Sequence, residues 1–168
     1  MNSFQRFMNT NNEECTLIPG QSNIKPSSIS KSILQIYHQN IQGLKWKSDE
    51  VLDFFHPVFP RLMCVTKHHL NQYEIMQFYT DNYTLGAYYC RHSLTKGGVC
   101  IFVHNSLNFV VSDLEKFSND QETEACTIRL LHNSYNICIL TIYRAPTGNF
   151  TCFINLYSSC VLPCVLPP

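Results

Sequence analysis

Cysteine and histidine are the residue types in this chain that most readily suggest chemistry, because thiolate and imidazole groups are the usual ligands of zinc. The 168 residues contain nine cysteines and seven histidines. Their spacing argues against a zinc site. No Cys-x-x-Cys pair occurs, the two nearest cysteines are Cys160 and Cys164, and the adjacent His68 and His69 cannot easily direct both rings at one ion. We therefore expect these side chains to have other roles.

Most of the cysteines are better explained as core residues. Cys100 and Cys138 lie inside apolar runs, where a reduced thiol behaves as a small hydrophobic side chain. The number of cysteines is odd, and neither a signal peptide nor a stretch of membrane-spanning length is recognisable. These features predict an intracellular protein, nuclear or cytoplasmic, without a membrane association.

A second set of polar residues follows apolar runs of strand type. Asn40 comes after the run 33–37, Lys67 follows the run 61–66, and Tyr143 and Arg144 close the run that starts at 137. The first two runs are predicted to be parallel strands joined through a helix, so both end on the same edge of a sheet. By residue type alone, Asn40 could be a turn residue, Lys67 a solvated strand end, and Tyr143 with Arg144 ordinary packing with a solvated tip.

The intervening pattern predicts the elements that position these residues. Residues 44–55 have near-helical apolar spacing that stops near Pro57. Strands are expected at 83–89, 99–103, 109–111, 126–131 and 137–143, separated by turn residues, as in antiparallel meanders. A last helix is expected over 149–157. The fold class is therefore mixed α/β, with a flexible leader at 1–31, one domain at 32–158 and a Pro-rich tail at 159–168.

The overall charge excludes one common mode of nucleic-acid binding. Lys plus Arg and Asp plus Glu both number 12, so no global positive field attracts a polyanion, and any such binding must be local. Charged residues make up only 14% of the chain and aromatic residues 12%, which predicts poor solubility in isolation.

Three segments taken together resemble a known superfamily. They are Ile36-Tyr37-His38-Gln39-Asn40-Ile41-Gln42-Gly43-Leu44, Leu62-Met63-Cys64-Val65-Thr66-Lys67-His68-His69-Leu70 and Ile142-Tyr143-Arg144-Ala145-Pro146-Thr147-Gly148-Asn149-Phe150. Tyr88–Arg91 and Lys96–Ile101 fit the same pattern. Their order and spacing resemble the first half of the endonuclease/exonuclease/phosphatase domain, in the version at the N-terminus of jockey-like retrotransposon polyproteins that lack long terminal repeats.

The resemblance implies a two-sheet α/β sandwich of the DNase I-like type, with a magnesium-dependent site that cleaves DNA phosphodiesters. It assigns Asn40 to the catalytic and metal site, and Tyr143 and Arg144 to contacts with the scissile phosphate, in a turn fixed by Pro146. Lys67 stands where the family has the glutamate that binds the metal. A protonated amine has no lone pair for a cation, so we expect magnesium to bind weakly and DNA to bind weakly or not at all.

The family's later Asp-x-Asn segment and its Ser-Asp-His segment, which carries the general base, have no counterpart in these 168 residues. The expectation is a truncated endonuclease-like domain derived from a retrotransposon and inactive in hydrolysis. Two alternatives remain open at this point. The chain could keep some nicking activity, or it could be a non-catalytic nucleic-acid- or protein-binding module on the same scaffold.

Overall fold

The computed structural model describes residues 5–9, 33–55, 59–92, 96–112, 114, 118–120, 122–132, 135–151, 153–155 and 157–158. The predicted Pro-rich tail at 159–168 and most of the predicted leader lie outside these residues. The elements are β1 (Gln5–Asn9), β2 (Ile33–Asn40), α1 (Ser48–Phe55), β3 (Leu62–Thr66), α2 (Gln72–Gln77), β4 (Tyr83–Tyr89), β5 (Val99–His104), β6 (Phe109–Ser112), β7 (Thr123–His132) and β8 (Tyr135–Arg144). The described residues at 150–158 are mostly helical.

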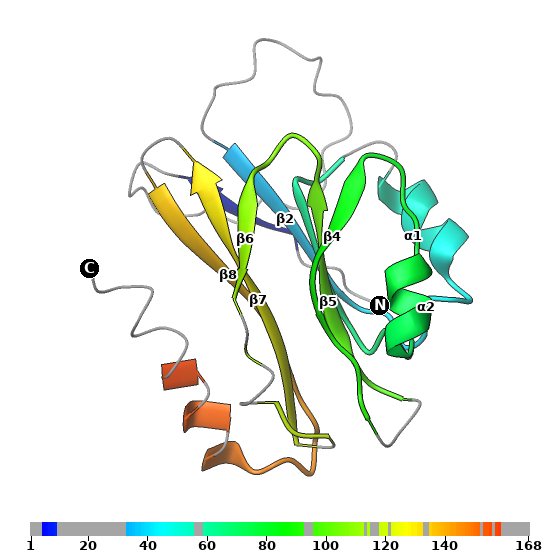
Figure 1. The fold of residues 1–168 in the computed structure, drawn as a ribbon, viewed down its shortest axis with the longest axis vertical. Coiled ribbons are helices and arrows are strands. Elements are labelled where there is room, and N and C mark those ends of the chain that lie inside the picture. The colour runs from blue at the N-terminus through cyan, green and yellow to red at the C-terminus, as the bar shows by residue number, and fades with distance from the viewer. Residues whose placement is uncertain are drawn as a thin grey trace.

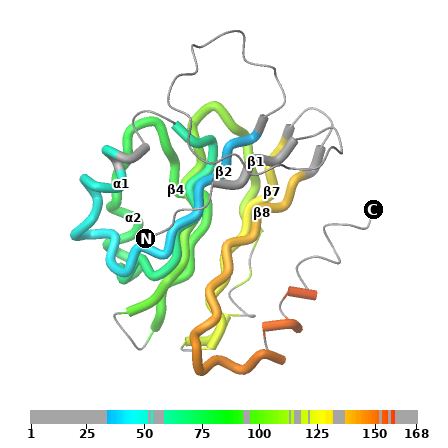
Figure 2. The backbone as a smooth tube through the Cα atoms, turned by 180° about the vertical axis from the view of Figure 1, so that it is seen from behind, coloured from blue at the N-terminus to red at the C-terminus, as the bar shows by residue number. Residues whose placement is uncertain are grey.

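Two sheets pack face to face and form the body of the fold (Figure 1). The larger sheet has the strand order β1-β2-β3-β5-β4, and the smaller one has the order β6-β7-β8. Helices α1 and α2 lie against the outer face of the larger sheet, as the view from behind also shows (Figure 2). The architecture is therefore a helix layer on a two-sheet sandwich, within the predicted mixed α/β class.

The parallel pairing of β2 and β3 confirms the predicted opening unit of the fold. Ile36 is in register with Leu62, and Asn40 is in register with Thr66, so both strands end at the same edge of the sheet. The connection between them carries α1, as a parallel crossover requires. The pairs β4–β5, β6–β7 and β7–β8 are antiparallel, as the meander prediction expected.

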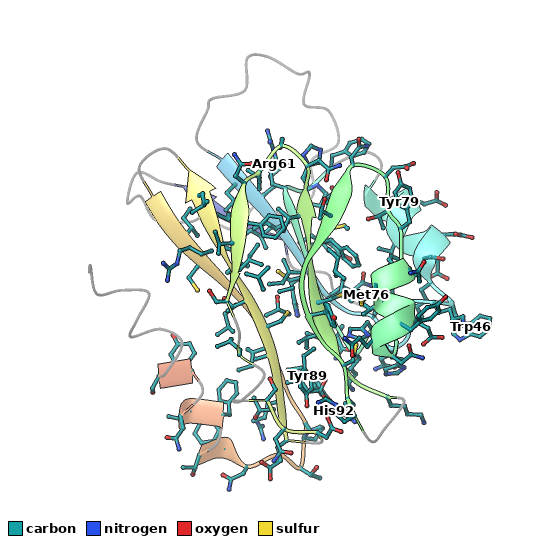
Figure 3. The ribbon with its side chains drawn as sticks, in the orientation of Figure 1. Trp46, Arg61, Met76, Tyr79, Tyr89 and His92 are labelled. Atoms are coloured by element: carbon teal, nitrogen blue, oxygen red, sulfur yellow. The ribbon has the colours of Figure 1, made fainter. Side chains whose placement is uncertain are left out.

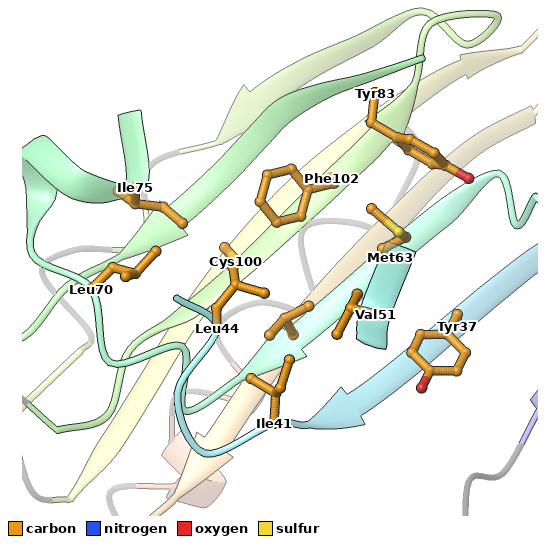
Figure 4. Packing of buried hydrophobic residues seen from close by; sticks show 11 residues of the cluster. Tyr37, Ile41, Leu44, Val51, Met63, Leu70, Ile75, Tyr83, Cys100 and Phe102 are labelled. Atoms are coloured by element: carbon orange, nitrogen blue, oxygen red, sulfur yellow. The ribbon is translucent and has the colours of Figure 1, made fainter. Parts of the chain in front are cut away.

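Two apolar clusters hold the layers together. One lies between the larger sheet and the helices and includes Leu44, Ile75, Cys100 and Phe102 (Figure 4). The other fills the space between the two sheets and includes Val99 and Ile101 of β5 and Ile128 of β7. Strand β5 contributes alternate residues to each cluster, which explains its continuously apolar sequence. Cys100 is fully buried, as predicted, whereas Cys138 is half-buried.

Three elements differ from the prediction by more than the length of a strand. Helix α1 begins at Ser48 rather than Leu44, because the N–H of Leu44 is bonded to His68 O at 2.9 Å and residues 44–47 form a turn in which the N–H of Lys47 donates to Leu44 O at 3.1 Å. Helix α2 was not predicted. It has six residues, too few for a periodic signal, and it is stabilised by a capping box between Asn71 and Glu74. Strand β1 pairs antiparallel with β2, so residues 5–9 of the expected leader are ordered on the free edge of β2.

Within the described part of the chain, no helix combines the length and apolar character that crossing a membrane requires.

Gly98→Ala should destabilise the fold much more than Gly43→Ala. Both glycines have positive φ angles, 85° and 110°, so each substitution carries a strain of about 1–2 kcal/mol. A Cβ at Gly98 would also overlap the buried His68 ring, whereas a Cβ at Gly43 would meet its nearest neighbour, His69 Nδ1, at 3.6 Å. Urea unfolding should show at least about 1 kcal/mol more loss for Gly98→Ala. Equal losses would mean that the His68 contact does not matter.

Candidate functional site

The candidate site begins where β2 and β3 end side by side. After Asn40, the chain stays hydrogen-bonded to the segment after β3: the N–H of Ile41 donates to Thr66 O at 3.0 Å, and that of Gly43 donates to Lys67 O at 2.9 Å. These bonds extend the parallel pairing beyond the sheet. They fix the backbone of the two segments that carry Asn40 and Lys67.

The segment that follows β3 has an unusual backbone. Lys67 and His69 both adopt left-handed φ angles, 57° and 59°, which non-glycine residues seldom adopt. The N–H groups of His68 and His69 donate to Gly98 O and Gly97 O at 3.3 and 2.8 Å. The segment is therefore held between the loop after β2 and the loop before β5, and strain of this kind tends to gather at functional positions.

Lys67 lies against Tyr143 of the second sheet. Its Nζ is 5.0 Å from the centroid of the Tyr143 ring, which is within cation–π distance. Both side chains are half-buried, and Asn40 is exposed at the adjacent strand end. Three of the four predicted site residues thus lie at the same edge of the sandwich: Asn40 is the last residue of β2, Lys67 follows β3, and Tyr143 belongs to β8.

Arg144, the fourth predicted residue, makes contacts of a different kind. Its Nη1 donates to Gly148 O at 2.9 Å and to Ala145 O at 3.4 Å. The N–H of Ala145 in turn donates to Glu122 O at 2.8 Å, and Gly148 is buried against the Glu122 backbone. In these contacts Arg144 stabilises the turn after β8, the turn that the sequence predicted Pro146 to fix.

A buried ion pair beside Tyr143 was not predicted from the sequence. Glu124 is in register with Tyr143 on β7, is fully buried, and accepts hydrogen bonds from the Arg91 guanidinium and from the Gly98 N–H. Burial raises the pKa of Glu124, and the bonds from Arg91 and Gly98 oppose that shift. One signal in the sequence could have indicated a buried carboxylate: Glu124 is followed by the largely apolar run of β7. Its two partners, Arg91 and Gly98, lie in the segments Tyr88–Arg91 and Lys96–Ile101, which are part of the resemblance.

His68 is a second buried polar residue that connects the loops. Its Nδ1 accepts from the Leu70 N–H at 3.0 Å, so its Nε2 carries the proton and donates to Tyr89 O at 3.1 Å. Tyr89 itself lies near the lower end of the sandwich, between the sheets, close to His92 (Figure 3). Burial lowers the pKa of His68 to about 4, which keeps the ring neutral.

The residues at this edge do not fit a divalent cation. Magnesium prefers carboxylate and other oxygen ligands, whereas the side chain that follows β3 at this edge is the Lys67 ammonium. The nearby carboxylate, Glu124, is already bound by Arg91. Across the described residues, no group of three His, Cys, Asp or Glu side chains is arranged to hold a metal ion.

Comparison with known proteins shows the fold. No family model and no curated protein matches the sequence. The structure resembles the AP endonuclease LMAP from Leishmania major with a TM-score of 0.55 and 18% sequence identity, over 76% of this chain and 45% of that one. This chain therefore spans less than half of that protein. At this identity the likeness shows the fold alone, a two-sheet α/β scaffold shared with that endonuclease, and it agrees with the predicted fold in this coarse outline.

Arg91→Met should be far more destabilising than Lys45→Met. Arg91 is the partner of a fully buried carboxylate, whose loss of pairing costs about 3–5 kcal/mol. Lys45 and Glu74 form an exposed pair at 3.0 Å, which water and salt screen, so the loss of this pair should cost little. Denaturant unfolding measures both. Adding Glu124→Met to Arg91→Met should recover part of the loss, and a double variant less stable than Arg91→Met would contradict the assignment of the cost to an unpaired charge.

Lowering the pH should destabilise the fold through His68. The folded pKa of His68, about 4, lies below the unfolded value of about 6.5, so the unfolded state binds the proton first as the pH falls. The stability that the neutral His68 ring contributes is therefore fully present above pH 6.5 and is lost as the pH falls towards 4. The full contribution is about 3 kcal/mol, of which about 2 kcal/mol disappears between pH 7 and pH 5. Urea unfolding and NMR titration of the ring measure it. A His68 midpoint near 6.5 in the folded protein would contradict the burial argument.

Proposed function

We propose that this chain carries a nuclease-like domain descended from the endonuclease of a retrotransposon without long terminal repeats, and that the domain does not hydrolyse phosphodiesters. Support for the descent comes from the DNase I-like scaffold combined with the order of the three family-like segments. Support for the loss of hydrolysis comes from one observation, the Lys67 ammonium next to the Tyr143 ring at the position of the family's metal ligand.

Electrostatics explains why this one residue matters so much. Exchanging a carboxylate for an ammonium changes the local charge by two units. At a separation of about 4 Å and an effective dielectric constant of about 20, each pair of unit charges contributes about 4 kcal/mol, and a divalent ion doubles that. A cation that should be attracted is instead repelled, so magnesium binds weakly if at all.

The other residues of the edge do not replace what Lys67 removes. Hydrolysis needs a base that activates water as well as the metal ligands. Both nitrogens of His68 are engaged in hydrogen bonds inside the protein, and Glu124 is enclosed by Arg91 and Gly98. Of the groups that remain at the edge, Asn40 and Tyr143 can orient a phosphate and the His69 imidazole can take up a proton, but none of the three replaces the carboxylate that holds the metal.

A plasmid-nicking assay tests this proposal. The purified 168-residue chain should give no magnesium-dependent conversion of supercoiled to open-circular DNA, even at high protein concentration. Lys67→Glu should remain inactive as well, because a single restored carboxylate supplies neither the remaining ligands nor the base. Lys45→Glu, which makes the same change of charge at an exposed residue of the loop after β2, is the matched control. Nicking by the wild-type chain that EDTA abolishes would refute the proposal, as would strong nicking by Lys67→Glu alone.

A further inference from the structure

A cavity of about 640 Å³ runs along the side of the sandwich that β4 and β6 form. Strand β4 is the end strand of the larger sheet, and β6 is an end strand of the smaller one (Figure 1). All the residues from Leu85 to His92 line the cavity. Successive side chains of a strand point to opposite faces, so a cavity above one face would be lined by alternate residues only. This cavity therefore lies beside the edge of β4.

The backbone of β4 presents hydrogen-bonding groups to the cavity. In an antiparallel pair, consecutive residues direct their N–H and C=O groups alternately towards and away from the neighbouring strand. Tyr89 is opposite Val99 of β5, and its carbonyl accepts from His68 Nε2 at 3.1 Å, so Tyr89 faces the body of the sheet. Tyr88 and Cys90 consequently direct their backbone groups to the cavity, where no strand among the described residues pairs with them.

Only one end of β4 carries a feature that protects an edge strand from pairing. A register shift between Leu85 and Ala87 marks an irregularity of the strand, and such bulges interrupt pairing with another chain. From Ala87 to Tyr89 the register with β5 is regular. This stretch contains neither proline nor lysine, the residues that commonly block an edge. It can therefore act as a template for an additional strand.

The wall opposite β4 is mostly apolar. On the side of the smaller sheet the cavity is lined by Val111, Ser112, Leu114, Ala125 and Cys126. Val111 is 56% exposed and borders the cavity, whereas its neighbour Val110, 50% exposed, does not. An apolar side chain that entered the cavity would remove Val111 from water, which is favourable.

The charged groups at one end of the cavity are compensated within the protein. The Arg91 guanidinium is bound to the buried Glu124 carboxylate. Asp120 accepts hydrogen bonds from the Tyr89 hydroxyl at 2.8 Å and from the His92 N–H at 3.0 Å. An ionic ligand would lose hydration there without meeting an uncompensated opposite charge from Arg91, Glu124 or Asp120. Electrostatics therefore favours an uncharged occupant.

We propose that the free edge of β4 binds an extended, uncharged peptide segment of a partner protein. The segment pairs with the backbone of residues 87–90 and places alternate apolar side chains against Val111 and Leu114. Backbone hydrogen bonds supply the attachment, and the apolar wall selects the side chains on one face of the segment. The inference goes beyond the proposed function, because it uses neither Lys67 nor a step of hydrolysis.

The test combines the full chain with the capped peptide acetyl-Thr-Val-Thr-Val-Thr-Val-Thr-amide, whose valines share one face in an extended conformation. Binding should slow the amide hydrogen exchange of Tyr88 and Cys90. Val111→Lys, which places a charge in the cavity, should weaken binding about tenfold or more, whereas Val110→Lys on the same strand should match the wild type. Methylating the peptide nitrogens of the threonines alone or of the valines alone should abolish binding in one case and preserve it in the other.

Several results would overturn the inference. These are no binding at about 1 mM peptide, equal affinities of the wild type and Val111→Lys at equal urea-unfolding midpoints, an equal loss in Val110→Lys, or equal effects of the two methylated peptides. Slower exchange confined to β6 would assign the peptide to the other edge strand and also contradict the proposal. Protection of Tyr88 and Cys90 without peptide, rising together with a dimer in ultracentrifugation, would identify a second copy of the chain as the occupant in place of a partner.

Discussion

The parallel pairing of β2 with β3 decides which side chains meet at the candidate site. It brings Asn40 and Thr66 into register, and the hydrogen bond from Gly43 to Lys67 carries the pairing past the ends of the strands. Because Lys67 is held there, its ammonium can lie against Tyr143 of the opposite sheet. Without that register, the polar residues of three separate segments would not meet at one edge.

The buried charges around this edge are compensated in pairs or kept neutral. Glu124 is balanced by Arg91 and by a backbone N–H, and His68 remains uncharged through burial and two hydrogen bonds. Lys67 is different, since neither ion pair of the described residues includes it. Among the described residues, the Lys67 ammonium is therefore a charge at this edge that no ion pair compensates.

The sequence predicted the parts of the fold that have strong periodic or apolar patterns. Strands β2 to β8 were recognised, with β7 and β8 longer than predicted, because continuous apolar runs are distinctive. Helix α2 was missed because its stability comes from a local capping box. Strand β1 was missed because its stabilisation comes from the free edge of β2, which no local pattern can reveal.

The candidate site was also predictable only in part, because some of its contacts join residues that are far apart in the sequence. Asn40, Lys67 and Tyr143 were identified because the order of their segments resembles a family. The Arg91–Glu124 pair depends on a contact between residues 33 positions apart, which spacing cannot indicate. The bonds of Arg144 to the following turn also depend on side-chain direction, which the family-like motif does not specify.

Titration of the protein with Mg²⁺ measures whether the edge that carries Lys67 takes up a divalent cation. Calorimetry with Mg²⁺, accompanied by NMR with paramagnetic Mn²⁺, reports both uptake and its location. No saturable one-to-one uptake is expected, and no selective broadening of the Asn40, Lys67 and Tyr143 amide signals. Stoichiometric uptake of Mg²⁺ with Mn²⁺ broadening centred on those three residues would contradict this expectation.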